Sequence, residues 1–225
     1  GQRLGIPQPA VWRHPFPGPG LSVRLLCSSG EPDRHGFDDI GPALADLASR
    51  SRVAMTVLPI RSVGVKSDLR AYEHPVLFGG DLPWPDLLTL ASTVYKVVPG
   101  VNRCLWRLDG GAVRQARPVA ATTTRQRLDL LREADAIVMD GLRRHGLYDA
   151  IWQCPTVLVP LEIDGRGREM VVVRPIHSER AMTATPARLP DALLDELRPA
   201  LAGLPGVGCV AIDITTKPPG TIEWE

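Results

Sequence analysis

Val57-Leu58-Pro59-Ile60 in the first half of the chain recurs as Leu158-Val159-Pro160-Leu161 in the second half. Each segment is apolar, has the length of a buried strand and carries a proline at its third position. In each half a charged turn and a second strand pattern follow, at residues 69–77 and 168–176. This shared order predicts a duplicated unit that begins with two strands.

A helix and a third strand complete the unit in each half. Apolar residues recur in both halves at the i, i+3 and i+4 spacing of an amphipathic helix. The two sets are Leu87, Leu88, Ala91, Val94, Tyr95 and Val98, and Leu193, Leu194, Leu197, Ala200, Leu201 and Leu204. A Pro-Gly-Val turn then stops each helix, and short strands follow at 103–108 and 209–214. We therefore expect an α+β fold of two tandem β-β-α-β repeats that form a pseudo-two-fold pair.

Three elements are expected outside the repeats. Residues 20–28 alternate as a strand, and residues 39–52 favour a short helix. Residues 124–145 favour one long additional helix before the second repeat, with Thr123 and Gln126 placed as a capping box.

The boundary between the repeats is expected at residues 109–124, which contain two glycines and show no apolar period. Residues 21–115 would then form the first repeat and residues 116–225 the second. Residues 1–20 remain outside both repeats.

Composition limits the classes of function. The chain has 225 residues, of which 44% are hydrophobic and 23% charged, so it can bury one large core or two small ones. Its net charge of +1 favours neither nucleic acid nor an anionic membrane as a partner. Without a long apolar run or a signal peptide, a cytoplasmic location is expected. Four cysteines lie far apart without a C-x-x-C motif, which favours buried free thiols over a zinc site or disulfides: Cys27, Cys104, Cys154 and Cys209.

The tail Lys217-Pro-Pro-Gly-Thr-Ile-Glu-Trp-Glu225 carries a lysine and carboxylates on a turn stiffened by prolines, so Lys217 and Glu223 are expected at defined positions. Two other motifs are equally unusual, Arg13-His-Pro-Phe-Pro-Gly-Pro-Gly20 and Ser62-Val-Gly-Val-Lys-Ser-Asp-Leu-Arg-Ala-Tyr72. Together the three motifs resemble the C-terminal region of GMP synthetase in its long, two-repeat form. That glutamine-hydrolysing ligase aminates XMP to GMP in purine nucleotide biosynthesis.

The resemblance implies how the chain takes part in the reaction. The family's phosphate loop and its amidotransferase cysteine motif do not occur in this sequence, so residues 1–20 would be the exit segment from a missing ATP pyrophosphatase domain. That domain would use ATP and Mg²⁺, and this chain would need no cofactor or metal and be inactive alone. Its partners would be XMP and the ATP pyrophosphatase and glutamine amidotransferase domains of the same enzyme. With two repeats in one chain, a pseudo-dimeric monomer is implied.

By the same resemblance, XMP is bound by Asp68 and Arg70 from the first half and by Gln153, Lys217 and Glu223 from the second. None of these residues is expected to be catalytic. XMP carries a dianionic phosphate, a ribose diol and carbonyl edges, which require cationic donors, a carboxylate and an amide.

The bland interpretation of these residues is structural. Asp68 and Arg70 would be a solvated charge pair, and Lys217 would form a salt bridge with Glu223. The chain would then be a non-catalytic dimerisation or assembly module, or a paralogue that binds another purine nucleotide.

Three positions bear on this choice. The family usually has Asn-Arg where Gly208-Cys209 stands, which removes a cation otherwise available to phosphate. Ser67 replaces a usual glycine, which matters if the backbone there needs a positive φ. His14 is expected to pack or to make an interdomain hydrogen bond instead of acting as a base.

Overall fold

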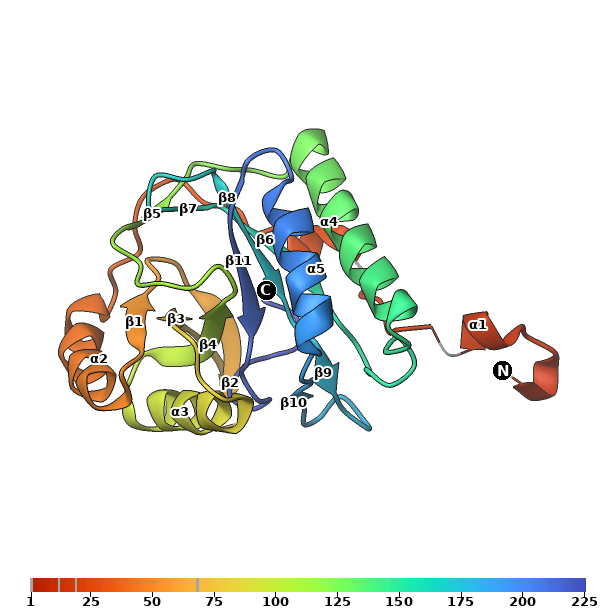
Figure 1. Ribbon diagram of the computed structural model, residues 1–225, viewed down its shortest axis with the longest axis horizontal. Helices are drawn as coiled ribbons and strands as arrows, with labels where there is room; N and C mark the ends of the chain where they lie inside the picture. The colour runs from red at the N-terminus through yellow and green to blue at the C-terminus, as the bar shows by residue number, and fades with distance from the viewer. Residues whose placement is uncertain (1, 12, 19, 68) are drawn as a thin grey trace.

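The computed structural model describes residues 2–11, 13–18, 20–67 and 69–225 (Figure 1). Its helices are η1 (Gln2–Leu4), α1 (Gln8–Val11), η2 (Gly20–Arg24), α2 (Phe37–Ser51), α3 (Trp84–Val97), α4 (Arg125–Arg144) and α5 (Asp191–Ala202). Its strands are β1 (Ala54–Val57), β2 (Ser62–Lys66), β3 (Leu69–Gly79), β4 (Val101–Arg107), β5 (Ala116–Pro118), β6 (Thr156–Val159), β7 (Leu161–Ile163), β8 (Glu169–Val173), β9 (Ile176–His177), β10 (Thr185–Pro186) and β11 (Val207–Asp213). The fold is therefore α+β.

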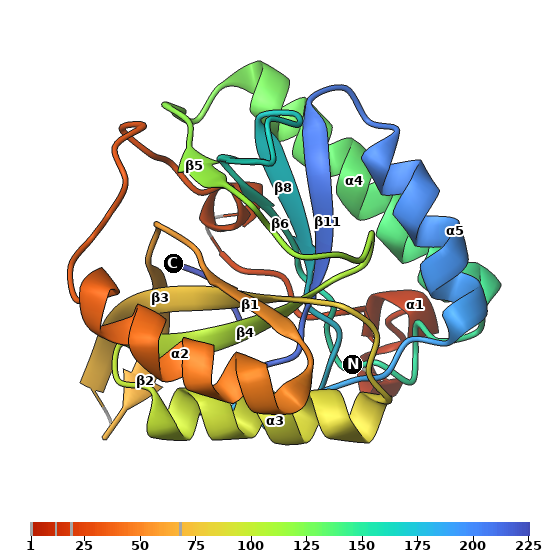
Figure 2. The same cartoon turned by 60° about the vertical axis from the view of Figure 1, so that its left-hand side comes forward.

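A mixed seven-stranded sheet forms the centre, in the order β1-β3-β4-β11-β8-β6, with β2 paired to β3 (Figure 2). In the middle, β4 and β11 are antiparallel. On either side, β3 is parallel to β4 and β8 is parallel to β11, and the edge strands β1 and β6 are antiparallel to their neighbours. The order of parallel and antiparallel pairings is therefore the same when the sheet is followed from either edge.

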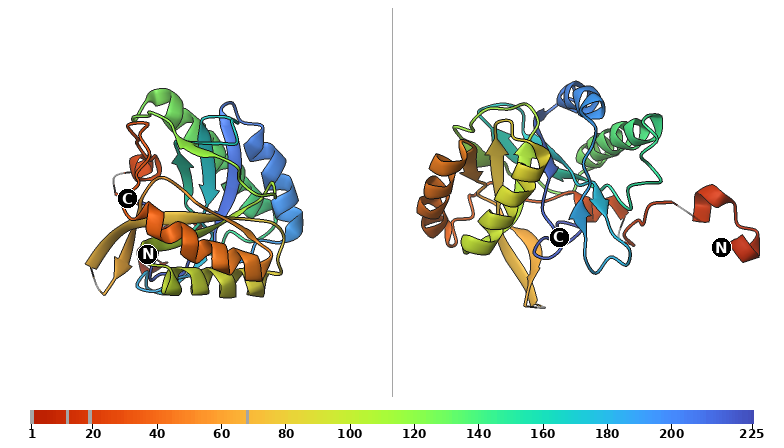
Figure 3. Two further views of the ribbon diagram at one scale, coloured as in Figure 1. Left: turned by 90° about the vertical axis from the view of Figure 1, so that its left-hand side faces the viewer. Right: turned by 60° about the horizontal axis from the view of Figure 1, so that its bottom comes forward.

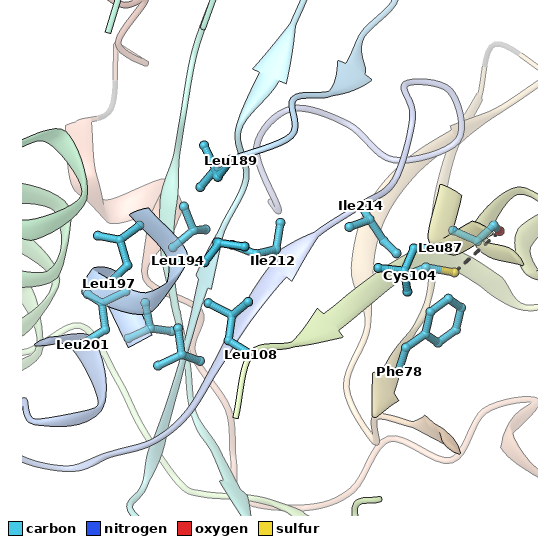
Figure 4. Packing of buried hydrophobic residues seen from close by; sticks show 14 of the residues in the cluster. Phe78, Leu87, Cys104, Leu108, Leu189, Leu194, Leu197, Leu201, Ile212 and Ile214 are labelled. Atoms are coloured by element: carbon cyan, nitrogen blue, oxygen red, sulfur yellow. Dashed lines mark hydrogen bonds between the residues drawn. The ribbon is translucent and has the colours of Figure 1, made fainter. Parts of the chain in front are cut away.

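One face of the sheet is covered by four helices. Helices α2 and α3 pack on the first half and α4 and α5 on the second (Figure 1). Alternate strand residues such as Phe78, Cys104 and Ile212 join the helices in one large core, in which Leu197 and Leu201 of α5 line up beside β11 (Figure 4). The apolar spacing in both halves therefore predicted the helices correctly.

The opposite face is covered by irregular segments of the chain instead of helices. Leu77, Leu105 and Ala211 face a second core that includes Trp224 of the tail. The segment after β4 crosses this face and adds β5, which pairs with β7. The predicted linker 109–124 is therefore part of the packed structure, because its short apolar residues cover the sheet.

Helices η1 and α1 lie apart from this body and project away from the sheet (Figures 1 and 3). The strand predicted at residues 20–28 was wrong. A 3-10 helix begins at Gly20, whose φ of 75° turns the chain, and only isolated bridges follow at Leu25 and Ser28.

Two smaller predictions also changed. Thr124, not Thr123, caps α4, because its side chain accepts a hydrogen bond from the amide of Arg127. The matched prolines Pro59 and Pro160 lie just after β1 and β6, since proline cannot donate to a strand ladder.

Candidate functional site

A buried ion triad lies just before the C-terminal tail, Lys217–Glu225. Asp213 ends β11, and its carboxylate lies 2.8 Å from Arg103 Nη1 and 2.7 Å from Arg174 Nη1. All three side chains are fully buried. Burial acts to raise the pKa of Asp213, but the two arginines and Thr215 hold it below its ordinary value of 3.8. Asp213 is therefore a carboxylate at neutral pH.

Arg103 also binds the tail itself. Its Nη2 donates to the carbonyl oxygens of Val63, Thr221 and Glu223 at 3.0, 2.9 and 2.8 Å. The fully buried ring of Trp224 lies 4.9 Å from its guanidinium carbon. Burial lowers the pKa of Arg103 to about 10, so it remains a cation at neutral pH. One buried arginine thus joins the β2–β3 hairpin to the tail.

Gly64 allows the tail to lie directly against β2. Gly64 forms a bridge with Gly220, and the amide of Val65 donates to Pro219 O at 2.7 Å. A Cβ on Gly64 would lie 2.6 Å from that Pro219 oxygen, so a larger residue would push the tail away. The motif at residues 62–72 and the tail are therefore one structural unit.

Glu223 is the polar centre of this unit. Its two carboxylate oxygens accept from Arg24 Nε and Nη2, each at 3.2 Å, and Oε1 also accepts from Gln153 Nε2 at 3.3 Å. The side chain of Arg24 is 4% exposed, whereas that of Glu223 is 20% exposed. Glu223 thus keeps a solvent-accessible edge while its orientation is fixed.

Lys217 is held at the other end of the tail. Its Nζ donates to Ala181 O at 2.6 Å, and its backbone pairs with that of Ala184. Burial and the charge of Arg174 lower the pKa of Lys217. Among the residues that the structure describes, Lys217 and Glu223 form no salt bridge with each other, so that structural interpretation was wrong.

Arg70 lies exposed on β3, opposite Val65 in the β2–β3 hairpin. Because Val65 bonds to the tail, Arg70 is on the element next to it. Asp68 lies outside the described residues. The structure therefore brings Gln153 and Glu223 into contact, and it places Arg70 and Lys217 on the two elements that meet here.

Sequence reasoning missed Arg24. It follows the motif at residues 13–20 closely, and the ring of Phe16 from that motif lies 4.9 Å from its guanidinium carbon. The position after the motif was the available signal. Nothing local links Arg24 to Glu223, which is 199 residues away in the chain.

His14 packs as predicted. Its ring stacks on Tyr148 with the centroids 4.1 Å apart, and its Nε2 lies 2.7 Å from Tyr148 O. Beside this stack, a groove of about 1000 Å³ is bounded by Val11, by residues 13–15 and by Arg143 and Trp152.

The departures from the family pattern have structural reasons. A Cβ on Gly208 would lie 2.0 Å from Arg166 O, so this position has no room for a side chain. Cys209 is buried in the core, and the lost phosphate contact stays a prediction. Ser67 has a φ of 49°, the left-handed conformation that glycine adopts most readily. Cys104 and Cys154 are also buried as predicted, whereas Cys27 is exposed.

Asp135 on α4 is a second carboxyl near Arg24. No hydrogen bond of standard geometry reaches its buried Oδ1 in the described part of the chain. Burial raises the pKa of Asp135 above its ordinary value of 3.8, opposed first by the charge of Arg24, then by the nearby hydroxyl of Thr156 and by the charges of His14 and Arg143. The folded-state pKa of Asp135 is therefore above its unfolded value. The protonated carboxyl thus contributes stability to the fold, which is fully present at acid pH and is lost as the pH rises through the folded pKa.

Asp135→Asn is accordingly expected to raise the thermal unfolding midpoint at pH 7, because the uncharged amide avoids the cost of burying a carboxylate. The difference from the parent should shrink as the pH is lowered, when the parent carboxyl becomes neutral. Unfolding scans at several pH values measure this. An asparagine variant that is less stable at pH 7 would show that attraction to Arg24 outweighs burial.

Within the described ranges, no group of three or more His, Cys, Asp or Glu side chains could hold a metal ion. None of the helices placed by the structure is long and apolar enough to cross a membrane.

Comparisons with known proteins all show similarity to the same family. The family model described as the GMP synthase C-terminal domain matches residues 140–224. Several relatives are similar over 100% of this chain. A probable glutamine-hydrolysing GMP synthase of Leptospira interrogans is 34% identical, with 37% of its own length covered. The GMP synthases of Dictyostelium discoideum and Thermobifida fusca are 28% and 43% identical, with 38% and 26% covered. The chain thus spans well under half the length of these relatives.

Proposed function

Because the chain belongs to the GMP synthase family and forms the C-terminal part of such enzymes, we propose that it holds XMP for ATP-dependent amination to GMP. ATP would adenylate the C2 oxygen of XMP with release of pyrophosphate, and ammonia would then displace AMP. ATP and Mg²⁺ would be bound by another part of the enzyme, and this chain alone would be inactive. Its contribution would be positioning, which can lower a barrier by several kcal/mol. A cytoplasmic location of the protein stays a prediction from composition.

The anchored tail is the observation that carries this proposal. Arg103 of the buried triad binds the backbone carbonyl of Glu223, and Ala181 and Ala184 hold Lys217, so both residues have fixed positions on an otherwise irregular segment. Lys217 and Arg70 are cations suited to the phosphate. The carboxylate of Glu223 only accepts hydrogen bonds, so it suits the ribose hydroxyls or a purine N–H. Gln153 can bind a carbonyl edge, and Asp68 completes the proposed set.

We test the proposal by calorimetric titration of the chain with XMP. Lys217→Ala and Arg70→Ala should each weaken binding about tenfold or more, because each removes a charge-assisted bond worth about 1.5–3 kcal/mol. Glu223→Gln should weaken binding less than Glu223→Ala, since an amide oxygen still accepts. Lys96→Ala on α3 is the control for loss of a positive charge, and it should bind XMP like the parent.

A non-catalytic assembly module is the second candidate. It is favoured by the internal partners of the tail, since Arg24 already binds Glu223 and Ala181 O already binds Lys217. If all the variants stay folded and bind XMP like the parent, this candidate replaces the first. Tight binding of another purine nucleotide in place of XMP would instead support a paralogue with a different ligand.

The order of strand pairings, which is the same from either edge of the sheet, supports a tandem duplication with a pseudo-two-fold axis between β4 and β11. Each half also sends the segment after its last strand onto the other half. The first adds β5 beside β7, and the second lays the tail against β2. We place one repeat at residues 21–115 and the other at 116–225.

The duplicated halves bury each other's central strands, so the chain should be monomeric in solution. Light scattering measures the mass directly. A stable dimer formed through β4 and β11 would contradict an internal pseudo-dimer.

A further inference from the structure

The contact between Arg24 and Glu223 joins two ends of the chain at the proposed ligand site. Arg24 donates through Nε and Nη2 to both oxygens of Glu223, which is the planar fork that guanidinium and carboxylate groups form. This geometry fixes the plane of the carboxylate as well as its place. With Arg24 almost fully buried, water competes little for these bonds.

A second donor makes the orientation of Glu223 specific. Gln153 Nε2 donates to Oε1, the oxygen that also accepts from Arg24 Nη2. Gln153 is itself fixed, because its backbone forms a bridge with Ile176. Glu223 could therefore turn only if both donors released it.

The N-terminal segment covers this contact. Phe16 lies over the guanidinium of Arg24, and two residues earlier His14 is stacked on Tyr148. Arg143 of α4 lies 4.9 Å from the same tyrosine ring. The docked segment from His14 to Phe16 therefore shields the Arg24 side of the fork.

We infer that Arg24 is a positioning residue that orients Glu223 for its ligand and makes that orientation depend on the docked segment from His14 to Phe16. The ligand part of this inference rests on the proposed function. Arg24 acts through Glu223, because its Nε and Nη2, the donors that face the tail, both bond to that carboxylate. The positioning part concerns the side chains alone and can be measured without XMP.

The experiment compares Arg24→Met with Arg117→Met in the 225-residue chain. Arg117 forms the same kind of fork with Glu162, at 3.2 and 2.9 Å, but it is mostly exposed and lies at the β5–β7 pair. The first readout is the NMR resonance of the Gln153 side-chain amide, which reports the place of Glu223. The second readout is the affinity for XMP by calorimetry.

Arg24→Met should shift the Gln153 amide resonance and weaken XMP binding about tenfold or more. Arg117→Met should do neither. Arg24→Lys should fall between Arg24→Met and the parent, because an ammonium keeps the charge but loses the fork. In a Glu223→Ala background, Arg24→Met should cause no further loss of affinity.

An unchanged Gln153 resonance in Arg24→Met would overturn the inference whatever XMP does. An equal loss of affinity with and without Glu223 would also overturn it, since Arg24 would then act on the ligand directly. If the resonance shifts but Glu223→Ala binds XMP like the parent, the positioning contact stands and the proposed ligand role of Glu223 fails.

Two milder variants, Arg24→Lys and Phe16→Ala, keep the test valid if Arg24→Met does not fold. Phe16 is 54% exposed, so Phe16→Ala should leave the core intact and admit water to the fork. It should shift the Gln153 resonance in the same direction as Arg24→Lys and weaken XMP binding less than Arg24→Met would. Phe16→Ala with both readouts unchanged would remove the docked segment from the inference.

Discussion

Asp213→Ala is expected to lower the free energy of unfolding by about 3–5 kcal/mol, because it leaves two arginines buried without their shared carboxylate. Arg103 and Arg174 are both fully buried, and Nε of each already lacks a hydrogen-bond partner among the described residues. Neither cation can reach water without moving the tail. Urea denaturation of parent and variant measures the loss.

A matched control for Asp213→Ala is Asp46→Ala. Asp46 also pairs with an arginine, Arg50 at 2.6 Å, but both side chains are about two-thirds exposed. Exposed pairs of this kind contribute little, so this variant should be nearly as stable as the parent. Equal stability of both variants would mean that the buried triad does not hold the tail.

Trp224→Ala is expected to cost about 3–5 kcal/mol, as for other large side chains removed from a core. The ring is fully buried beside Arg103, and its Nε1 donates to Asp213 Oδ2 at 3.2 Å. Its loss should also free Glu223, the preceding residue, and so weaken XMP binding. Unfolding and calorimetry on one sample measure both effects.

The variant Trp224→Phe separates packing from hydrogen bonding at this position. It keeps an aromatic ring and loses the Nε1 donor, so it should cost less than Trp224→Ala, about 1–3 kcal/mol. If Trp224→Ala lowered the free energy of unfolding less than Trp224→Phe does, the packing of this ring would not hold the tail.

The apolar spacing carried the prediction of the regular elements. The stripes that include Leu87 and Leu197 predicted α3 and α5, because a helix that covers a sheet must bury one face. Residues 20–28 show where this fails. Their alternation suits a strand, but the turn at Gly20 starts a 3-10 helix, and local turn chemistry decided the outcome.

The candidate site was predictable only in part. Sequence motifs indicated which segments form the site, but the contacts between those segments depend on the fold. Glu223 meets Arg24 from the other end of the chain, and Arg103 reaches the tail from β4, so no local spacing connects them. Arg103 occupies a core position, which only the packing reveals.

The location of XMP can be determined from a crystal structure of this region with XMP bound, within the complete enzyme that contains it. We expect XMP between the β2–β3 hairpin and the tail, with its phosphate on Lys217 and Arg70 and its ribose or purine edge on Glu223. A structure with XMP bound well away from the tail, and with Glu223 in contact only with Arg24 and Gln153, would contradict it.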